Sequence, residues 1–170
     1  MKVMIVSDTH GCRENLEIAL KQIGPLDLFI HMGDVEGGLK YIEELVTCEK
    51  HFVAGNNDYF LSLPRELEFF IGPYKTFITH GHQFSVSLGV EHLRDEGISR
   101  GDNIMMFGHT HRPYLEIGEE ITILNPGSIS YPRQPGRQSS FMTMELDREN
   151  NITYRTYYLQ ENGVYEELEK

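Results

Sequence analysis

The sequence has few cysteines and no long apolar run, and each shortage excludes a class of protein. Its 170 residues contain only Cys12 and Cys48, which lack the short spacing of a redox or metal-binding pair. We expect free thiols, because disulfides belong mainly to secreted chains. No segment, including the N-terminal residues 1–6, approaches the ~18 consecutive apolar residues of a membrane span, and no signal peptide is recognisable. We therefore expect a cytoplasmic protein with no membrane association.

Basic residues are also scarce. Fifteen Lys and Arg stand against 26 Asp and Glu, for a formal net charge of −11. General binding to DNA or RNA needs basic patches that displace counterions, so this balance argues against it. Small phosphate substrates are not excluded, because bound divalent cations would reverse the sign of the electrostatic field inside the site.

No linker, repeat or low-complexity segment divides the chain, and we expect one domain over residues 1–170. The first half alternates apolar runs with amphipathic stretches. The expected elements are a strand at 3–6, a helix at 13–23, a strand at 26–30, a helix around 39–46 and a short strand ending at Val53. This βαβαβ pattern predicts a parallel sheet with right-handed crossovers.

The second half predicts hairpins and one further helix. The expected strands are 68–71 with 74–79, 114–117 with 121–124, and 141–146 with an alternating strand at 152–158. The spacing of Val86, Val90 and Leu93 predicts a helix over 85–96. The closing EELEK residues are interpreted as a solvated tail.

Five apolar runs each end at residue types that bind metals. The candidate ligands are Asp8, His10, Asp34, Asn56, His80, His109 and His111. Because open α/β sheets bind ligands at the carboxyl ends of their strands, these side chains are expected to converge. Asp8 and His10 are two residues apart, which would place both on one face at the end of a strand. The set is too rich for one ion and points to two metals that share a carboxylate.

The motifs D-x-H, G-D, G-N-x-D, H-G-H and G-H-T-H, in this order, resemble the calcineurin-like metallophosphoesterase superfamily. The form with Gly55-Asn56-Asn57-Asp58 looks most like its compact bacterial and archaeal phosphodiesterase branch, as does N-P-G-S at 125–128. The resemblance implies an α/β fold, a four-layer αββα sandwich with mixed β-sheets. It also implies that one ion is held by Asp8, His10 and His111, the other by Asn56, His80 and His109, with Asp34 bridging them.

The function implied is hydrolysis of a small phosphodiester at a dinuclear centre through a metal-bridging hydroxide. Manganese is favoured by the resemblance, whereas the ligand types alone would also suit iron, zinc, nickel or cobalt. Asp34 and Asn56 would serve catalysis as ligands, and Asp58 would orient the site or the substrate. His82 is expected to face the substrate or the metals, against the alternative of an ordinary loop histidine.

One position departs from the family pattern. Many members carry histidine directly after the Gly-Asn pair, where it protonates the leaving group or stabilises the transition state, but this chain has Asn57. An amide cannot act as a general acid. The compact branch also lacks that histidine, so activity is still expected, but phosphoprotein phosphatase activity is not.

Several alternatives stay open at this point. The chain could be a phosphomonoesterase or nucleotidase, or a non-catalytic scaffold similar to the retromer subunit of this fold; every ligand position here carries a competent residue, which favours an enzyme. The sequence leaves open which substrate is the natural one and whether the chain forms a homo-oligomer. His31 is either a satisfied core histidine or a brace behind the ligands. Arg133 and Arg137 could hold phosphate, although a solvated loop arginine is commoner.

Overall fold

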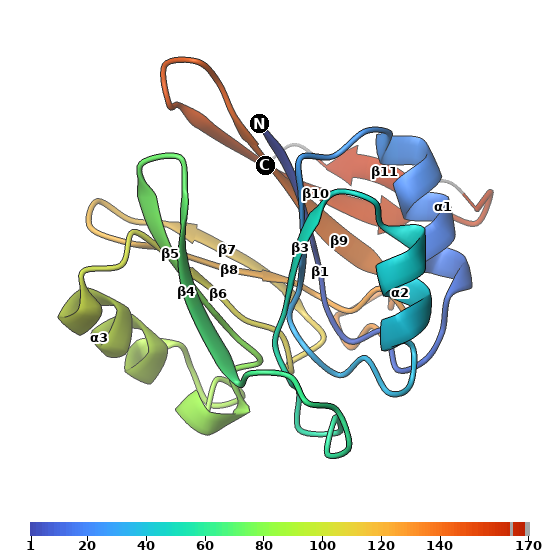
Figure 1. Ribbon diagram of the computed structural model, residues 1–170, viewed down its shortest axis with the longest axis horizontal. Coiled ribbons are helices and arrows are strands. Elements are labelled where there is room, and N and C mark those ends of the chain that lie inside the picture. Colours follow the sequence, from blue (N-terminus) through green and yellow to red (C-terminus); the bar gives the residue numbers. More distant parts are fainter. Residues whose placement is uncertain (164, 169–170) are drawn as a thin grey trace.

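The computed structural model describes residues 1–163 and 165–168, and it contains two β-sheets packed face to face (Figure 1). The first sheet is formed by β1 (Lys2–Val6), β2 (Leu28–His31), β3 (Glu49–Phe52), β9 (Ser140–Leu146), β10 (Ile152–Leu159) and β11 (Tyr165–Leu168). The second is formed by β4 (Glu66–Ile71), β5 (Tyr74–Thr79), β6 (Ile104–Met106), β7 (Pro113–Ile117) and β8 (Thr122–Pro126).

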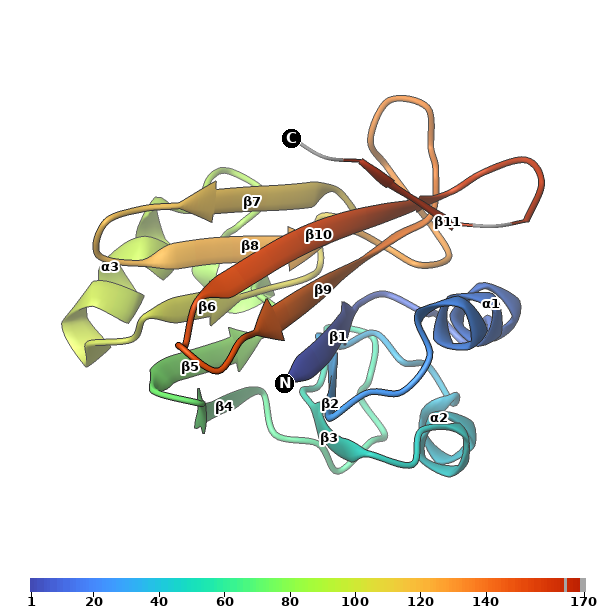
Figure 2. The same cartoon turned by 90° about the horizontal axis from the view of Figure 1, so that it is seen from above.

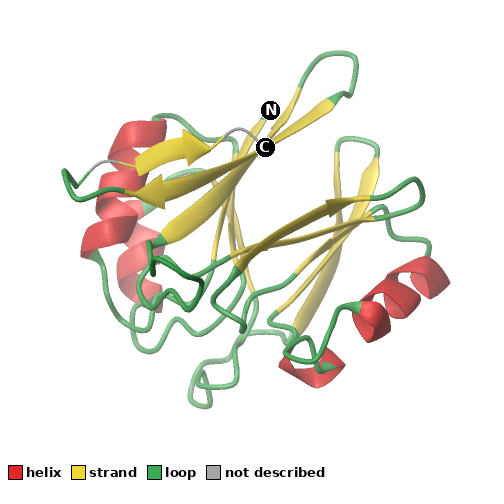
Figure 3. Ribbon diagram, turned by 180° about the vertical axis from the view of Figure 1, so that it is seen from behind, coloured by secondary structure: helices red, strands yellow, loops and turns green. Residues whose placement is uncertain are grey.

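Helices cover the outer faces of both sheets (Figures 2 and 3). The first sheet carries α1 (Glu14–Ile23) and α2 (Leu39–Leu45), and the second carries α3 (Glu91–Arg100), which follows a short 3-10 helix, η1 (His82–Phe84). The four-layer αββα architecture is therefore confirmed. Among the described residues, no helix has the length and apolar character to cross a membrane.

Strand β1 is apolar along its whole length because both of its faces are buried. Val3 and Ile5 face the second sheet in the central core, whereas Met4 and Val6 pack beneath α1 and α2. All four side chains are 0% exposed. A strand buried on both faces requires a continuous apolar run rather than alternation, which explains the sequence of residues 3–6.

The predicted βαβαβ unit is confirmed. β1 pairs in parallel with β2, and β2 in parallel with β3, while β9 lies antiparallel on the other side of β1. In the second sheet, β5, β6 and β8 are also parallel neighbours. The predicted hairpins β4–β5, β7–β8 and β9–β10 are present as well.

The helix predicted over 85–96 begins too early. Ser85 has a φ of 55°, which an α-helix cannot contain, and the helix starts only at Glu91 and continues to Arg100. Val86 therefore reaches the core from a loop. Within α3, Gly97 lies so close to the sheet that an added Cβ would be 2.4 Å from Ile121 Cδ1.

The interpretation of the closing EELEK residues as a solvated tail is wrong for 166–168. Together with Tyr165 they form β11, which pairs antiparallel with β10 and extends the first sheet. The buried ring of Tyr165 packs against Phe141, and its backbone N–H donates to Gln22 of α1. The charge run concealed this strand; residues 169 and 170 lie outside the described part.

Candidate metal centre

The segments that follow β1, β2, β3, β5 and β6 meet at one end of the molecule. Backbone hydrogen bonds tie them together: Asp8 N–H donates to Gly33 O (3.0 Å), His10 N–H to Asp34 O (2.9 Å), and Gly108 N–H to His80 O (3.1 Å). The two sheets therefore contribute to one site, and the structure brings together all seven residues that the sequence nominated.

The ligand residues converge after the ends of neighbouring strands, as expected, but the side chains are not oriented by strand alternation. Strand β1 ends at Val6, so Asp8 and His10 do not leave one face of a strand. Five of the seven candidates have φ between 46° and 67°: Asp8, His10, Asp34, His109 and His111. Such left-handed residues cost about 1–2 kcal/mol each, and strain of this kind gathers at functional sites. The turns, not strand alternation, aim these side chains inward.

The first group of candidate ligands is Asp8, His10, Asp34 and His111, whose ligand atoms all lie within 4.8 Å of one another. Each histidine donates its Nδ1–H outward, His10 to Glu36 Oε1 (2.7 Å) and His111 to Tyr131 O (2.5 Å). Their Nε2 atoms then face each other at 3.3 Å. His111 Nε2 also lies 3.1 Å from Asp8 Oδ1. Acceptors this close repel one another unless a positive charge lies among them.

The second group is centred on the Asn56 amide oxygen. His80 Nε2 lies 3.1 Å and His109 Nδ1 2.8 Å from Asn56 Oδ1. His80 donates its Nδ1–H to Met32 O (2.7 Å), which leaves Nε2 directed at the centre. Metal–ligand bonds of about 2.0–2.2 Å bring neighbouring ligand atoms to about 3 Å from one another, so these separations suit a common ion.

Asp34 connects the two groups. Its Oδ2 lies 3.5 Å from His80 Nε2 and 3.9 Å from His10 Nε2. Gly55 allows this position, because a Cβ there would lie 2.0 Å from Asp34 Oδ1. Asn57 donates to the same carboxylate through its backbone N–H and through its side chain, both at 2.9 Å.

The buried charges attract a cation. Asp8 Oδ1 is buried and has no hydrogen-bond donor, although a buried unpaired carboxylate oxygen is costly. Burial opposes ionisation of Asp34, yet the hydrogen bond and charge of His80 hold its pKa at about 2. Burial likewise opposes protonation of His80, but Asp34 and Asp8 raise its pKa. The residues present therefore fit divalent cations, which would take the place of that proton.

Asp58 and His82 lie at the edge of the centre. The Asp58 carboxylate accepts backbone N–H groups of Gly55 (2.8 Å), Val35 (3.0 Å) and Glu36 (2.9 Å), so it locks the loops after β2 and β3 together. The ring of His82 lies 5.6 Å from that of His80 and 6.1 Å from that of His109, between centroids. Burial and then the charges of those two histidines lower the pKa of His82.

Several supporting residues were not identified from the sequence. Glu36 orients His10, but no local pattern indicated that its loop turns back. The N-P-G-S segment did carry a signal: Asn125 Nδ2 donates to Gly108 O (2.7 Å), and Ser128 Oγ donates to Asp8 O (2.8 Å). Both hold ligand-bearing turns. Arg133 and Arg137 line a hollow beside His10 and His111.

His31 braces two ligand-bearing turns from behind. Its Nδ1 accepts from Gly33 N–H (3.2 Å), and its Nε2–H donates to Thr9 Oγ1 (3.1 Å). The side chain is 0% exposed, and burial lowers its pKa from 6.5 to about 4. It is therefore a neutral histidine that holds the backbone beside Asp8 and Asp34.

We expect the burial of His31 to lower the free energy of unfolding as the pH decreases from about 6.5 to about 4. In that window the unfolded chain binds a proton at position 31 and the folded chain does not, which removes up to about 3 kcal/mol from the free energy of unfolding. Chemical unfolding at a series of pH values, in chelator, should show a shallower dependence for His31→Gln than for the wild type. His92→Gln, at an exposed histidine, is the control. Equal slopes for wild type and His31→Gln would contradict the expectation.

Comparison with known proteins gives concordant findings. The profile of the calcineurin-like phosphoesterase superfamily domain matches residues 1–149. The chain is 31% identical to the probable metallophosphoesterase YsnB of Bacillus subtilis over 99% of this chain and 97% of that protein. It is 37% identical to the phosphodiesterase YfcE of Escherichia coli K12, over 86% and 89%. Wild-type Vps29 of Entamoeba histolytica, crystallised with Zn²⁺, has the same fold, with a TM-score of 0.83 and 24% identity over 99% of this chain and 98% of that one.

Proposed function

The chain belongs to the calcineurin-like phosphoesterase superfamily, and on that premise we propose that it is a phosphodiesterase with a dinuclear metal centre. The observation that carries the proposal is the pair of acceptor groups that share Asp34. A single ion would leave one group of facing acceptors uncompensated. In the proposal, Asp8, His10 and His111 hold one ion, Asn56, His80 and His109 hold the other, and Asp34 binds both.

When bound, two divalent ions supply Lewis acidity toward the phosphoryl oxygens and toward the attacking water. The chain's own residues keep the ligands in place. Glu36 fixes the ring of His10 and the tautomer that directs Nε2 inward, and Tyr131 O does the same for His111. Asn57 holds the Asp34 carboxylate, and Asp58 holds the loop that presents Asn56. We propose manganese as the working metal.

The alternative functions are compatible with the same fold and the same ligand residues. The fold is common to Vps29, and a fold alone does not decide function. A phosphomonoesterase or nucleotidase would use the same ligands. Phosphodiesterase activity is favoured because YfcE, at 37% identity, bears that name, and a catalytic centre because each nominated ligand is present and directed inward.

Metal analysis followed by a substrate panel tests the proposal. We expect two Mn²⁺ per chain after loading, and at least about tenfold higher kcat/KM for bis(4-nitrophenyl) phosphate than for 4-nitrophenyl phosphate, a difference of about 1.4 kcal/mol between the activation barriers. Asp8→Asn, purified identically, controls for contaminating phosphatases. Preference for the monoester would favour the phosphatase, and two bound ions without turnover of either ester would favour the scaffold.

A further inference from the structure

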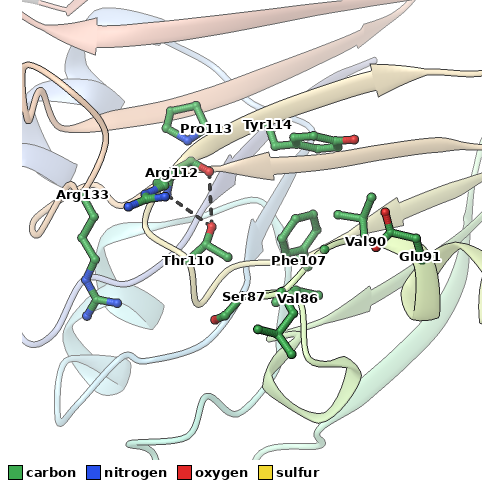
Figure 4. Close-up of a pocket in the computed structure, with 12 residues that line it drawn as sticks. Val86, Ser87, Val90, Glu91, Phe107, Thr110, Arg112, Pro113, Tyr114 and Arg133 are labelled. Carbon is green, nitrogen blue, oxygen red and sulfur yellow. Dashed lines mark hydrogen bonds between the residues drawn. The ribbon is translucent and has the colours of Figure 1, made fainter.

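Two hollows lie beside the candidate metal centre, and Arg133 lines both of them. The first, of about 620 Å³, has mixed walls, in which the charged side chains of Glu91, Arg112 and Arg133 lie beside the apolar side chains of Val86, Leu88, Val90, Phe107, Pro113 and Tyr114. In Figure 4, Phe107 and Val86 lie on one side of this space and Pro113 and Tyr114 on another. Thr110 and Arg112, which flank His111 in the chain, connect it to the centre.

The second hollow borders the candidate ligands directly. It measures about 540 Å³, and His10 and His111 form part of its wall. Arg133 and Arg137 also line it, and so does Glu36, whose carboxylate is occupied by His10 Nδ1. The backbone N–H of Arg133 donates to His111 O (3.0 Å), so this arginine is anchored to a ligand-bearing turn.

The arginines of the second hollow are uncommitted within the described part of the chain. Arg133 and Arg137 form no ion pair there, although the protein as a whole carries a net charge of −11. By contrast, Arg94 pairs with Glu116 (2.6 Å) and Arg100 with Glu96 (2.6 Å). Two uncompensated guanidinium groups beside a metal centre favour an anionic ligand.

The scissile phosphate alone does not account for these charges. A phosphodiester carries one negative charge, and two divalent ions already offset it even after the charges of the Asp8 and Asp34 carboxylates are subtracted. We propose that the substrate is a phosphodiester that carries a second phosphate on one of its alcohol arms, and that Arg133 and Arg137 bind this second phosphate. This inference rests on the proposed function and deepens it by naming the substrate class.

A matched pair of chromogenic esters tests the inference. The 4-nitrophenyl ester of thymidine 5′-phosphate is compared with the same ester bearing an added 3′-phosphate. We expect the added phosphate to raise kcat/KM about tenfold or more, as charge-assisted hydrogen bonds would. In the double variant Arg133→Met/Arg137→Met this ratio should fall to about one. Arg148→Met, at an exposed arginine in the β9–β10 turn, should keep the wild-type ratio.

A binding measurement gives a readout that does not depend on turnover. Calorimetric titration of the metal-loaded protein should show tighter binding of thymidine 3′,5′-bisphosphate than of thymidine 5′-phosphate, and the double variant should lose the difference. Turnover of both esters with a ratio near one would overturn the inference and leave the phosphodiesterase function intact. An equal loss for both esters in the double variant would overturn it too, because the arginines would then act on the scissile phosphate. If neither ester is cleaved with two ions bound, the proposed function fails, and the titration alone decides whether a second phosphate is bound.

Discussion

Replacement of Asp34 by alanine is expected to remove or weaken both metal ions together and to lower kcat/KM for a diester by at least about 10³-fold, or about 4 kcal/mol in the activation barrier. The reason is the position of its carboxylate, 3.5 Å from His80 Nε2 in one group and 3.9 Å from His10 Nε2 in the other. Elemental analysis of the folded variant, after loading at fixed free metal, measures the stoichiometry directly.

Two further variants make the stoichiometry decisive. Asp8→Asn alters a carboxylate that faces His111 in the first group, so this variant should lose one ion and keep the other. Asp147→Asn changes a carboxylate in the β9–β10 turn, where it accepts from Glu149 and Asn151, and should bind metal as the wild type does. Two ions per folded chain of Asp34→Ala would show that Asp34 does not bridge.

The fold was predictable where one local pattern determined the structure. Continuous apolar runs such as 3–6 mark strands buried on both faces, and the stretches 13–23 and 39–46 bury one helical stripe. The start of α3 was missed because Val86, Val90 and Leu93 matched a helical period that Gly89, with a φ of 157°, interrupts. Strand β11 was missed because the charged run EELEK concealed a hairpin with β10, the strand that directly precedes it in the chain.

The candidate site was predictable in composition but not in geometry. Convergence of the seven residues followed from the ends of neighbouring strands, and the structure brings the seven together. The left-handed turns at Asp8 and His10 were not predicted, because non-glycine residues adopt them only when the surrounding structure compensates the strain. The same holds for Glu36, whose contact with His10 depends on the path of a whole loop.

Asn57 is the basis of the second large effect that we expect, a strong dependence of the rate on the leaving group. Its side chain donates to Asp34 Oδ2 (2.9 Å), so the residue that replaces the family's histidine holds the proposed bridging carboxylate. An amide has no proton to transfer to a departing oxygen near neutral pH. The leaving group must then carry its own negative charge.

Diesters with acidic aryl leaving groups are therefore expected to react much faster than alkyl diesters. A positioned general acid typically contributes about 10²–10⁴-fold, and this is the assistance that a poor leaving group lacks here. A series of diesters with one constant arm and leaving groups of graded pKa, assayed where chemistry limits the rate, should give a steep decline of kcat/KM with leaving-group pKa.

His82 is the residue against which this expectation is checked, because its ring lies 5.6 Å and 6.1 Å from those of His80 and His109. If Asn57 leaves the site without an acid, His82→Gln should show the same steep decline as the wild type. A wild-type rate nearly independent of leaving-group pKa, together with a steep decline in His82→Gln, would instead identify His82 as the acid. Since both enzymes are compared on one series of esters, differences in metal loading scale all rates alike and leave the slopes unchanged.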